Sequence, residues 1–285
     1  MNRYMRIFYY GVFGAIGGLC GWQVSNLLGL SFIKNIYLAE IVVGAFIGFC
    51  IGFTIGIAEG LIRKNIAHTL KAGLISGGLG LAGGAIGLPL AEIVFQLIGA
   101  GILGRVLGWG IFGLLTGLAA GVTGGAQMWK GGLGGLLGGM LGGGLLMAAR
   151  QWLSDPMLGK AAGMILLGAA VGAFIALIVF VLSKAWIEVT SGKMKGMEFI
   201  LDKFLKENGP SAFIGSSALK AEIVLPDPDI APQHAMLKGF GSHFTLKDMS
   251  MNGTFINNRR IEVSRLSNQQ KIRLGNTDLV YHEKR

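Results

Sequence analysis

Six apolar segments occupy most of the first part of the chain, and each is about as long as a membrane-spanning helix. They cover residues 7–30, 38–62, 72–99, 106–128, 131–149 and 161–183. An α-helix needs about 20 apolar residues to cross the hydrocarbon core of a bilayer. The sequence therefore predicts an α-helical transmembrane bundle of about six helices, in which Trp129 and Lys130 separate the fourth helix from the fifth.

The composition of the chain changes sharply at Lys184. Before this point lie 41 of the 49 glycines and only four acidic residues, whereas 25 of the following 101 residues are charged. Apolar helices suit hydrocarbon, and short strands that alternate polar and apolar residues suit a protein surface in water. We therefore expect two domains, a glycine-rich transmembrane helical domain at 1–184 and a cytoplasmic β domain at 185–285.

The distribution of Lys and Arg predicts how the helices are oriented. If each of the six segments crosses once, seven basic residues fall on the side of the N-terminus and four on the other. Basic residues favour the cytoplasmic side, so both termini are expected in the cytoplasm and the lipid bilayer is an expected partner. The net charge is +10. Because the chain has no basic patch with interleaved aromatic residues, nucleic acid is not an expected partner.

Glycines recur at every fourth residue in several of the apolar segments. The series are Gly44, Gly48, Gly52, Gly56 and Gly60, then Gly113, Gly117, Gly121 and Gly125, and a third one from Gly131 to Gly143. At 3.6 residues per turn this spacing keeps the glycines on one face, where a second helix can approach to backbone contact. The pattern predicts glycine-zipper packing of the bundle, and it is also compatible with a homo-oligomer.

The chain also contains an internal repeat. The sequence GFTIGIAEG at 52–60 is similar to GLLTGLAAG at 113–121, and a glycine-rich segment follows each of them. Such self-similarity at a fixed offset indicates a duplicated unit. We interpret it as a duplicated helical hairpin.

Two carboxylates lie inside apolar segments and are candidates for an intramembrane function. Ionisable groups in this environment are costly, so they are commonly functional. For Glu59 the alternative is an ion pair with Arg63, four residues further along the same helix. Glu92 follows Pro89 deeper in its segment. Transport or conduction through Glu92 and purely structural packing are the two interpretations.

Beyond Lys184 the sequence predicts many short strands. Apolar and polar residues alternate at 185–190, 197–201, 212–215, 222–225, 235–240, 243–248, 254–257, 271–274 and 278–282. Polar, proline or glycine residues separate these runs, as in Asn208-Gly209-Pro210. Many short strands within about 100 residues are typical of a β-sandwich.

Several motifs in this region resemble those of a forkhead-associated (FHA) domain. They are IGS at 214–216, AEIVLPDPDIAPQHAML at 221–237, LKDMSMNGTFINNRRI at 246–261 and KIRLGNTDLVYHE at 271–283. The resemblance covers essentially all of 185–285. The membrane half in turn resembles that of glycine-rich multi-pass bacterial membrane proteins with a C-terminal FHA domain.

The resemblance implies an all-β sandwich that binds phosphothreonine peptides through loops at one end. In FHA domains an Arg after a glycine and a Ser three residues before a His hold the phosphate, the His supports the loop, and the Asn of an Asn-Gly pair holds the peptide backbone. This sequence keeps His234, Asn252 and Gly253, but it has Ser216 in place of the Arg and Ala231 in place of the Ser. The expected partner-binding residues are Ser216, Ser217, Gln233, His234, Ser250, Asn252, Gly253, Thr254 and Asn257.

The two replacements remove charge-assisted contacts to the phosphate. A hydrogen bond to a charged group contributes about 1.5–3 kcal/mol, so phosphopeptide affinity is expected to fall by about two to four orders of magnitude. Three functions remain open: a membrane-anchored signalling adaptor whose altered FHA domain docks a cytoplasmic protein without phosphate, a genuine phosphothreonine reader in a Ser/Thr kinase pathway, and an FHA-regulated channel or transporter.

An enzyme is not expected. The sequence has no Ser/His/Asp or Cys/His arrangement at usable spacing, no P-loop, and no GxGxxG that opens a soluble βαβ unit. The four histidines and two cysteines are too scattered for a metal site, and no cofactor is expected. Asp227 and Asp229 flank Pro228 in a segment that we interpret as a solvated turn.

Overall fold

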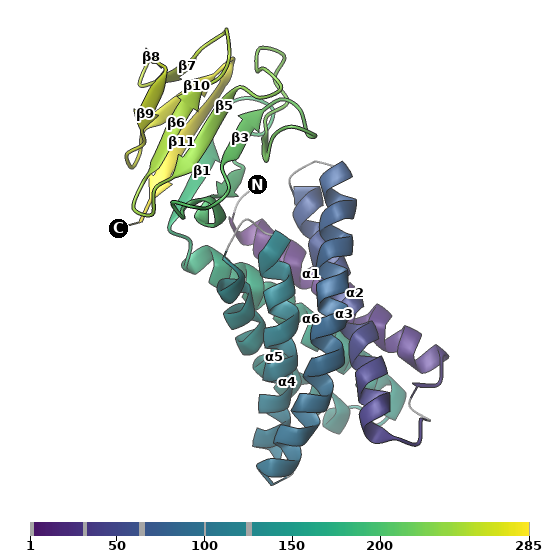
Figure 1. Cartoon of the computed structure of the whole chain (residues 1–285). Coiled ribbons are helices and arrows are strands. Elements are labelled where there is room, and N and C mark those ends of the chain that lie inside the picture. The colour runs from purple at the N-terminus through teal and green to yellow at the C-terminus, as the bar shows by residue number, and fades with distance from the viewer. Residues whose placement is uncertain (1–2, 31–32, 63–65, 100, 124–126, 285) are drawn as a thin grey trace. The chain divides into compact units, whose positions relative to one another are not determined.

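The computed structural model describes residues 3–30, 33–62, 66–99, 101–123 and 127–284. These residues form two compact units, of which one covers Tyr4–Val181 and the other begins at Leu182. The first unit is entirely helical and the second is a β-sandwich (Figure 1). The domain ranges 1–184 and 185–285 stay a prediction.

Six long helices make up the first unit, as the apolar segments predicted. Their bounds are α1 Arg3–Leu27, α2 Ile36–Ile62, α3 Ile66–Leu97, α4 Ile102–Thr123, α5 Met128–Trp152 and α6 Pro156–Val181. Each contains a stretch that is long and apolar enough to cross a membrane. The predicted boundary between the fourth and fifth helices is wrong by a few residues, because Lys130 lies buried in the first turn of α5.

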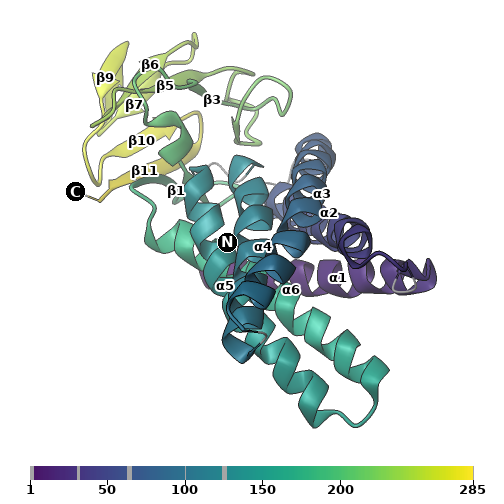
Figure 2. The same ribbon diagram turned by 60° about the horizontal axis from the view of Figure 1, so that its bottom comes forward.

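The helices are arranged as three inner and three outer ones. The inner helices α2, α4 and α6 contact one another. The outer helices α3 and α5 each pack between two inner helices, α3 between α2 and α4 and α5 between α4 and α6, and α1 packs on α6 and α2. Helices that follow one another in the chain therefore lie side by side (Figure 2).

The glycines of α2 all face α3. A Cβ atom at any of the five positions would overlap α3: Gly44 against Gly84, Gly48 against Gly80, Gly52 against Ser76, Gly56 against Ala72 and Gly60 against Thr69. A glycine costs a helix about 1 kcal/mol relative to alanine, so a series of five is compatible with a stable helix only where close packing compensates. The two backbones here approach to direct contact along nearly the whole length of α2.

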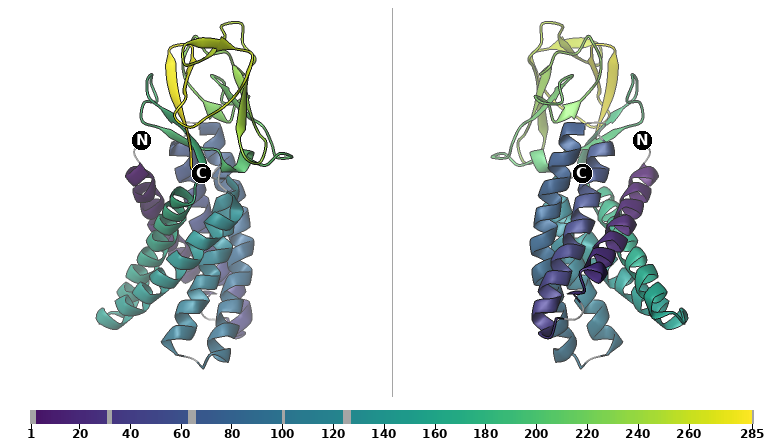
Figure 3. Two further views of the ribbon diagram at one scale, coloured as in Figure 1. Left: turned by 90° about the vertical axis from the view of Figure 1, so that its left-hand side faces the viewer. Right: turned by 90° about the vertical axis from the view of Figure 1, so that its right-hand side faces the viewer.

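The second half of the internal repeat packs in the same way. Gly113 and Gly117 of α4 lie against the carbonyl groups of Gly135 and Gly131 in α5, and Gly121 lies against Met128. Gly125 lies outside the described residues. The other glycine stripe of α5, which includes Gly138, faces α6. The α2–α3 and α4–α5 pairs are thus two antiparallel hairpins with matching glycine contacts (Figure 3).

A buried ionic cluster joins the first two helices. The guanidinium of Arg6 in α1 lies 2.7 Å from the carboxylate of Glu59 in α2, and the Tyr10 hydroxyl donates a hydrogen bond to the same oxygen. Glu59 and Tyr10 are almost completely buried. Removing one member of a buried pair leaves the other charge uncompensated, so this cluster has a structural role in holding α1 to α2. The alternative partner predicted for Glu59, Arg63, lies outside the described residues.

The second unit is a sandwich of two antiparallel sheets with one parallel pair. The strands are β1 Ala185–Val189, β2 Glu198–Ile200, β3 Ala212–Gly215, β4 Ile223–Val224, β5 Ala235–Gly239, β6 Phe244–Asp248, β7 Thr254–Ile256, β8 Arg259–Ile261, β9 Val263–Arg265, β10 Lys271–Leu274 and β11 Thr277–Glu283. One sheet has the order β2-β1-β11-β10-β7-β8 and the other β4-β3-β5-β6-β9, with β3 and β4 parallel. Side chains that alternate along these strands fill the space between the sheets, among them Ile187, Leu237, Leu246 and Tyr281. The predicted β-sandwich is therefore confirmed.

The sequence did not predict β8 and β9. Both are edge strands, and their side chains are exposed or half-buried, so they show no alternation of polar and apolar residues. A two-residue turn at Asn257 and Asn258, with φ angles of 49° and 66°, connects β7 to β8. Asparagine tolerates this left-handed conformation better than most residues do.

The glycine contacts predict a difference between two neighbouring substitutions in α3. A Cβ at position 80 would overlap the Gly48 carbonyl, whereas a Cβ at position 78 meets open space. We expect Gly80→Ala to lower the thermal unfolding temperature of the full chain in nanodiscs. Gly78→Ala should leave it unchanged or raise it slightly, because alanine favours the helix by about 1 kcal/mol. Equal effects of the two substitutions would contradict this packing.

Candidate functional site

Three loops meet at one end of the sandwich and form the candidate site. They follow β3, β4 and β6 and cover residues 216–222, 225–234 and 249–253. The first two loops lie against each other, since a Cβ at Gly215 would overlap the Pro232 carbonyl and the Ser216 N–H donates to the Ala231 carbonyl over 3.0 Å. Position 215 therefore requires glycine because of this close backbone approach.

His234 is buried and connects the loop after β4, in which it lies, to the loop after β6. Its Nδ1 accepts a hydrogen bond from the Ala231 N–H over 3.1 Å. In the neutral tautomer this places the ring proton on Nε2, which lies 3.2 Å from the Gly253 carbonyl and 3.0 Å from the Ser250 hydroxyl. The ring therefore supports the loops from within and is not available to a ligand.

Asp248 organises the loop that follows β6. Its Oδ1 accepts hydrogen bonds from the Thr254 hydroxyl over 2.9 Å and from the N–H and hydroxyl of Ser250. Burial alone would raise the pKa of Asp248, but the hydrogen bonds from Thr254 and Ser250 outweigh it, so the pKa lies below its ordinary value. Thr254 and Ser250, both candidates for partner binding, thus have their polar groups engaged inside the loop.

Asn252 lies at the exposed tip of the same loop. Its side-chain amide donates to the Asp229 carbonyl over 2.8 Å and so joins the loop after β6 to the loop after β4. The next residue, Gly253, has a φ angle of 81°, which favours glycine, and the side chain of Arg260 lies against it. The Asn252 amide is thus engaged within the domain, and a ligand that used its N–H group would have to displace the Asp229 carbonyl.

The loop after β4 is also fixed on its other side, although Pro228 and Asp229 lie exposed in a turn, as the sequence indicated. Asp227 Oδ2 accepts from the Asn276 N–H over 3.0 Å and from the Thr277 hydroxyl over 2.8 Å, and Asp229 Oδ2 accepts from the Asn276 amide over 2.6 Å. Burial would raise the pKa of Asp227. Its hydrogen bonds from the Asp229 N–H, the Thr277 hydroxyl and the Asn276 N–H outweigh this effect together with the charge of Lys193, so the pKa lies below its ordinary value. Asp227 therefore stays ionised.

Of the remaining predicted site residues, Ser216, Ser217 and Gln233 lie in the three loops, whereas Asn257 does not. The Gln233 amide donates to the Lys220 carbonyl over 3.0 Å, while the hydroxyls of Ser216 and Ser217 have no hydrogen-bond partner within the described part of the chain. Asn257 lies in the β7–β8 turn, where it exchanges hydrogen bonds with Lys271. The structure therefore places Asn257 with the turn rather than with the three loops.

The loops themselves carry more acidic than basic residues, and Arg260 of β8 donates a hydrogen bond to the Met251 carbonyl beside them. Residues 216–234 and 249–253 contain one basic residue, Lys220, and three acidic ones, Glu222, Asp227 and Asp229. Carboxylates repel a phosphate, and the repulsion is strongest where water is partly excluded. Neither the position of Ser216 nor that of Ala231 brings a cation to compensate.

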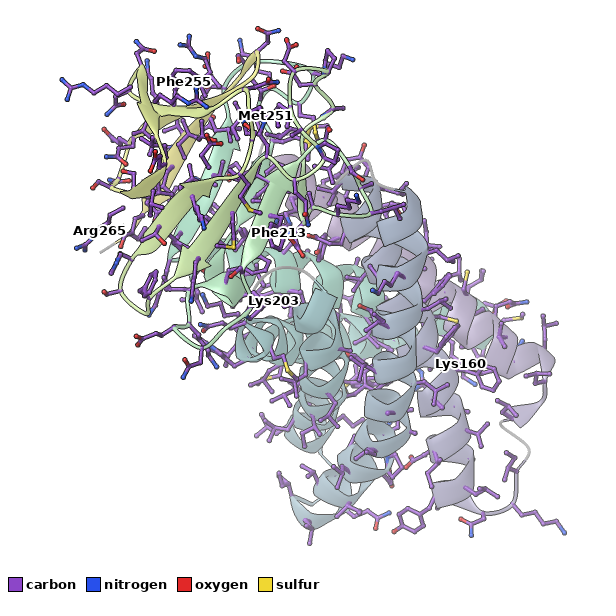
Figure 4. All side chains as sticks on the ribbon, turned by 45° about the horizontal axis from the view of Figure 1, so that its top comes forward. Lys160, Lys203, Phe213, Met251, Phe255 and Arg265 are labelled. Carbon is purple, nitrogen blue, oxygen red and sulfur yellow. The ribbon has the colours of Figure 1, made fainter. Side chains whose placement is uncertain are left out.

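Apolar side chains project from two of the three loops. Leu219 is 88% exposed, Met249 48% and Met251 97%, and Figure 4 shows Met251 on the loop between β6 and β7. Exposed methionines adapt to the shape of a partner and are enriched at protein interfaces. The sequence analysis did not select these residues. The motif MSMNG at 249–253 has two methionines among polar residues, and this pattern could have indicated exposed apolar side chains in a loop.

No arrangement of side chains in the described residues suggests catalysis or metal binding. Among them, no three His, Cys, Asp or Glu side chains lie close enough together to hold a metal ion. What the site offers is a surface of loop backbone, a few hydroxyls and exposed methionines. Such a surface is suited to recognising another protein.

The lowered pKa of Asp248 predicts how the loop responds to acid. Because the pKa is lower in the folded state, ionised Asp248 stabilises the fold above its ordinary pKa, and this contribution is lost as the pH falls through the folded-state pKa. We expect Asp248→Ala to weaken protection of the 248–254 amides from hydrogen exchange at pH 7, by an amount equivalent to about 1–3 kcal/mol.

Hydrogen-exchange mass spectrometry of the full chain, corrected for intrinsic rates, measures this effect. The difference from the unsubstituted chain should shrink towards pH 3. The exposed Glu207→Gln serves as the control. A difference that stays constant from pH 7 to pH 3 would argue against a role of the ionised carboxylate.

Comparison with known proteins identifies the fold family of this region. Residues 212–275 match the family model described as FHA domain. The chain is similar to the FHA domain of CT664 protein from Chlamydia trachomatis, with 29% identity over 36% of this chain and 100% of that one, at a TM-score of 0.33.

Two further solved structures are similar over the same region. One comes from a structural and functional analysis of phosphothreonine-dependent FHA domain interactions (25% identity, 36% of this chain, 98% of that chain, TM-score 0.31). The other is the FhaA FHA domain complexed with the intracellular domain of Rv3910 (26% identity, 34% of this chain, 99% of that chain, TM-score 0.30). No curated protein matches the chain. Following six helices that could span a membrane, the chain therefore contains an FHA domain at residues 212–275.

Proposed function

We propose that the protein is a membrane-anchored docking module whose FHA domain binds a cytoplasmic protein through its three loops without requiring phosphate. The observation that carries this proposal is the composition of the loops, which expose Leu219, Met249 and Met251 and have Ser216 and Ala231 at the positions expected to hold a phosphate. An exposed apolar cluster on a water-soluble domain commonly marks an interaction surface. The helices anchor this surface at the membrane.

The energetics favour docking without phosphate. A phosphothreonine carries a charge of about −2 and is bound best by arginine. Here it would meet Ser216 and Ala231 beside a loop that keeps Asp227 ionised. Losing two charge-assisted hydrogen bonds of about 1.5–3 kcal/mol each is enough to remove a micromolar affinity.

A phosphothreonine reader is the second candidate, and two observations favour it. The internal support of the loops by His234, Ser250 and Asp248 is complete, and Asn252 is exposed at the tip. The hydroxyls of Ser216 and Ser217, which have no partner among the described residues, could donate to a phosphate. The pathway would then contain a Ser/Thr kinase.

The proposed location is the cytoplasmic membrane of a bacterium, with both termini in the cytoplasm. The excess of basic residues on the side of the N-terminus supports this orientation. Exposed apolar side chains on the outer helices, such as Leu74 and Leu81 of α3, are suited to contact lipid. The same faces allow a homo-oligomer. A channel or transporter finds no support in Glu59, because Arg6 and Tyr10 neutralise it.

A peptide-binding experiment separates the two candidates. The full chain in nanodiscs is titrated with a library of phosphothreonine peptides and the same peptides without phosphate, and fluorescence polarisation is measured. We expect affinities that differ by less than about tenfold between the two forms, because positions 216 and 231 lack the Arg and the Ser that would hold the phosphate. Selective micromolar binding of phosphopeptides that Asn252→Ala abolishes would instead establish the reader.

The apolar surface predicts where a partner touches the domain. A photo-crosslinking amino acid at position 251 should give a discrete protein adduct in cells, and one at position 263 should not. Val263 on edge strand β9 is a matched control because it is also apolar and 61% exposed. Adducts of equal yield at both positions would show that the loops are not the docking surface.

A further inference from the structure

A cavity of about 280 Å³ lies among α2, α3 and α4. It is found where α2 begins, α3 ends and α4 begins, which is the end of the helical unit opposite to the end of α6. Its volume is close to the lower limit for small-molecule sites. The lining combines two carboxylates, one guanidinium and two aromatic rings with apolar side chains: Glu40, Glu92, Arg105, Phe95, Trp109 and aliphatic residues such as Val43.

Glu40 is the member of this lining that most needs a partner. Its Oε2 atom is inaccessible to solvent and has no hydrogen-bond partner among the described residues. A carboxylate oxygen that is shielded from water and has no partner destabilises the folded protein. One or two hydrogen bonds from a ligand would offset this cost. Such atoms are rare in native proteins unless an unseen group occupies the site.

The other charged groups of the cavity do not neutralise Glu40. Glu92 accepts a hydrogen bond from the Gln96 amide over 2.9 Å, which leaves its charge uncompensated. The Arg105 guanidinium lies 4.5 Å from the centre of the Phe95 ring and forms no ion pair with either carboxylate within the described chain. Two carboxylates and one guanidinium therefore line the same cavity. One further positive charge would make the sum of these charges zero.

We propose that this cavity binds a small organic ammonium ion, with its charged nitrogen between Glu40 and Glu92 and its alkyl part against the apolar lining. A primary ammonium has three donors, enough for both carboxylates, and the aromatic residues Phe95 and Trp109 are part of the lining. A bare metal ion would fill only a small part of 280 Å³ and would find two carboxylates where it needs about six oxygen ligands.

The ammonium group can come from two sources, a free amine in solution or the headgroup of phosphatidylethanolamine. The cavity lies within two helical turns of the helix ends, because Glu40 is close to the start of α2 and Glu92 is close to the end of α3. At this depth a spanning helix passes through the headgroup layer of the bilayer. Both sources can therefore reach it.

Calorimetric titration of the full chain with n-propylammonium tests the proposal. Nanodiscs of phosphatidylglycerol alone contain no amine, and sodium chloride keeps the ionic strength constant. We expect saturable binding with one site per chain. In nanodiscs that also contain phosphatidylethanolamine, weaker apparent binding identifies the headgroup as a competitor, and unchanged binding identifies a free amine as the ligand; each of these results supports the proposal.

Matched variants separate the roles of charge and space. Glu40→Gln and Glu92→Gln keep the shape of the side chain and should each weaken binding by about tenfold or more, because a charge-assisted hydrogen bond is lost. Ala39→Phe keeps both carboxylates but fills the cavity, and should abolish binding. Glu207→Gln removes a carboxylate from an exposed loop of the other unit and should change nothing.

The unfolding temperature of each variant without ligand shows that it is folded. The proposal is overturned if propylammonium does not bind to the unsubstituted chain in phosphatidylglycerol nanodiscs. It is equally overturned if Glu40→Gln and Glu92→Gln bind as tightly as the unsubstituted chain, which would mean that the carboxylates are protonated. Saturable binding of Ca²⁺ without any binding of propylammonium would also exclude it.

Discussion

Direct contact between helix backbones is the constraint on which the helical unit depends. Where Gly48 meets Gly80 and Gly113 meets Gly135, even a methyl group would push the helices apart. In hydrocarbon the hydrophobic effect does not drive helices together, so their stability comes from close van der Waals packing. This explains why a single residue type is repeated at fixed spacing in α2, α4 and α5. The buried contact of Glu59 with Arg6 and Tyr10 adds a specific connection between α1 and α2.

The sandwich depends on a different kind of interaction, a buried polar network. His234, Ser250 and Asp248 satisfy one another and hold the loop after β6, while Asp227 and Asp229 fix the loop after β4 to the β10–β11 turn. Fully satisfied networks of this kind make loops rigid. The domain therefore presents a preformed surface even though it lacks the arginine with which FHA domains hold phosphate, and a rigid surface loses little entropy when it binds a partner.

The helical unit and the sandwich each contain groups that their own internal packing leaves available. In the sandwich these include the exposed side chains of Leu219, Met249 and Met251, and in the helices they include the Glu40 carboxylate in its cavity. The first are apolar side chains exposed on a water-soluble domain, and the second is a carboxylate in a largely apolar cavity. Natural structures tolerate such exceptions where a ligand or partner compensates them.

The sequence by itself determined the six helices and the sandwich, and its FHA motifs indicated the supporting role of His234, because all of these follow from local periodicity or from short motifs. Strands such as 212–215 and 271–274 were predicted with their observed bounds, whereas β8 and β9 at the sheet edges have no alternating pattern to reveal them. Tertiary structure alone decided that Glu59 pairs with Arg6, that Asn252 binds the Asp229 carbonyl, and that Glu40 and Glu92 line one cavity. Each of these contacts joins residues more than 20 positions apart, and no local spacing specifies which distant groups the packing of helices and loops will bring within hydrogen-bond distance.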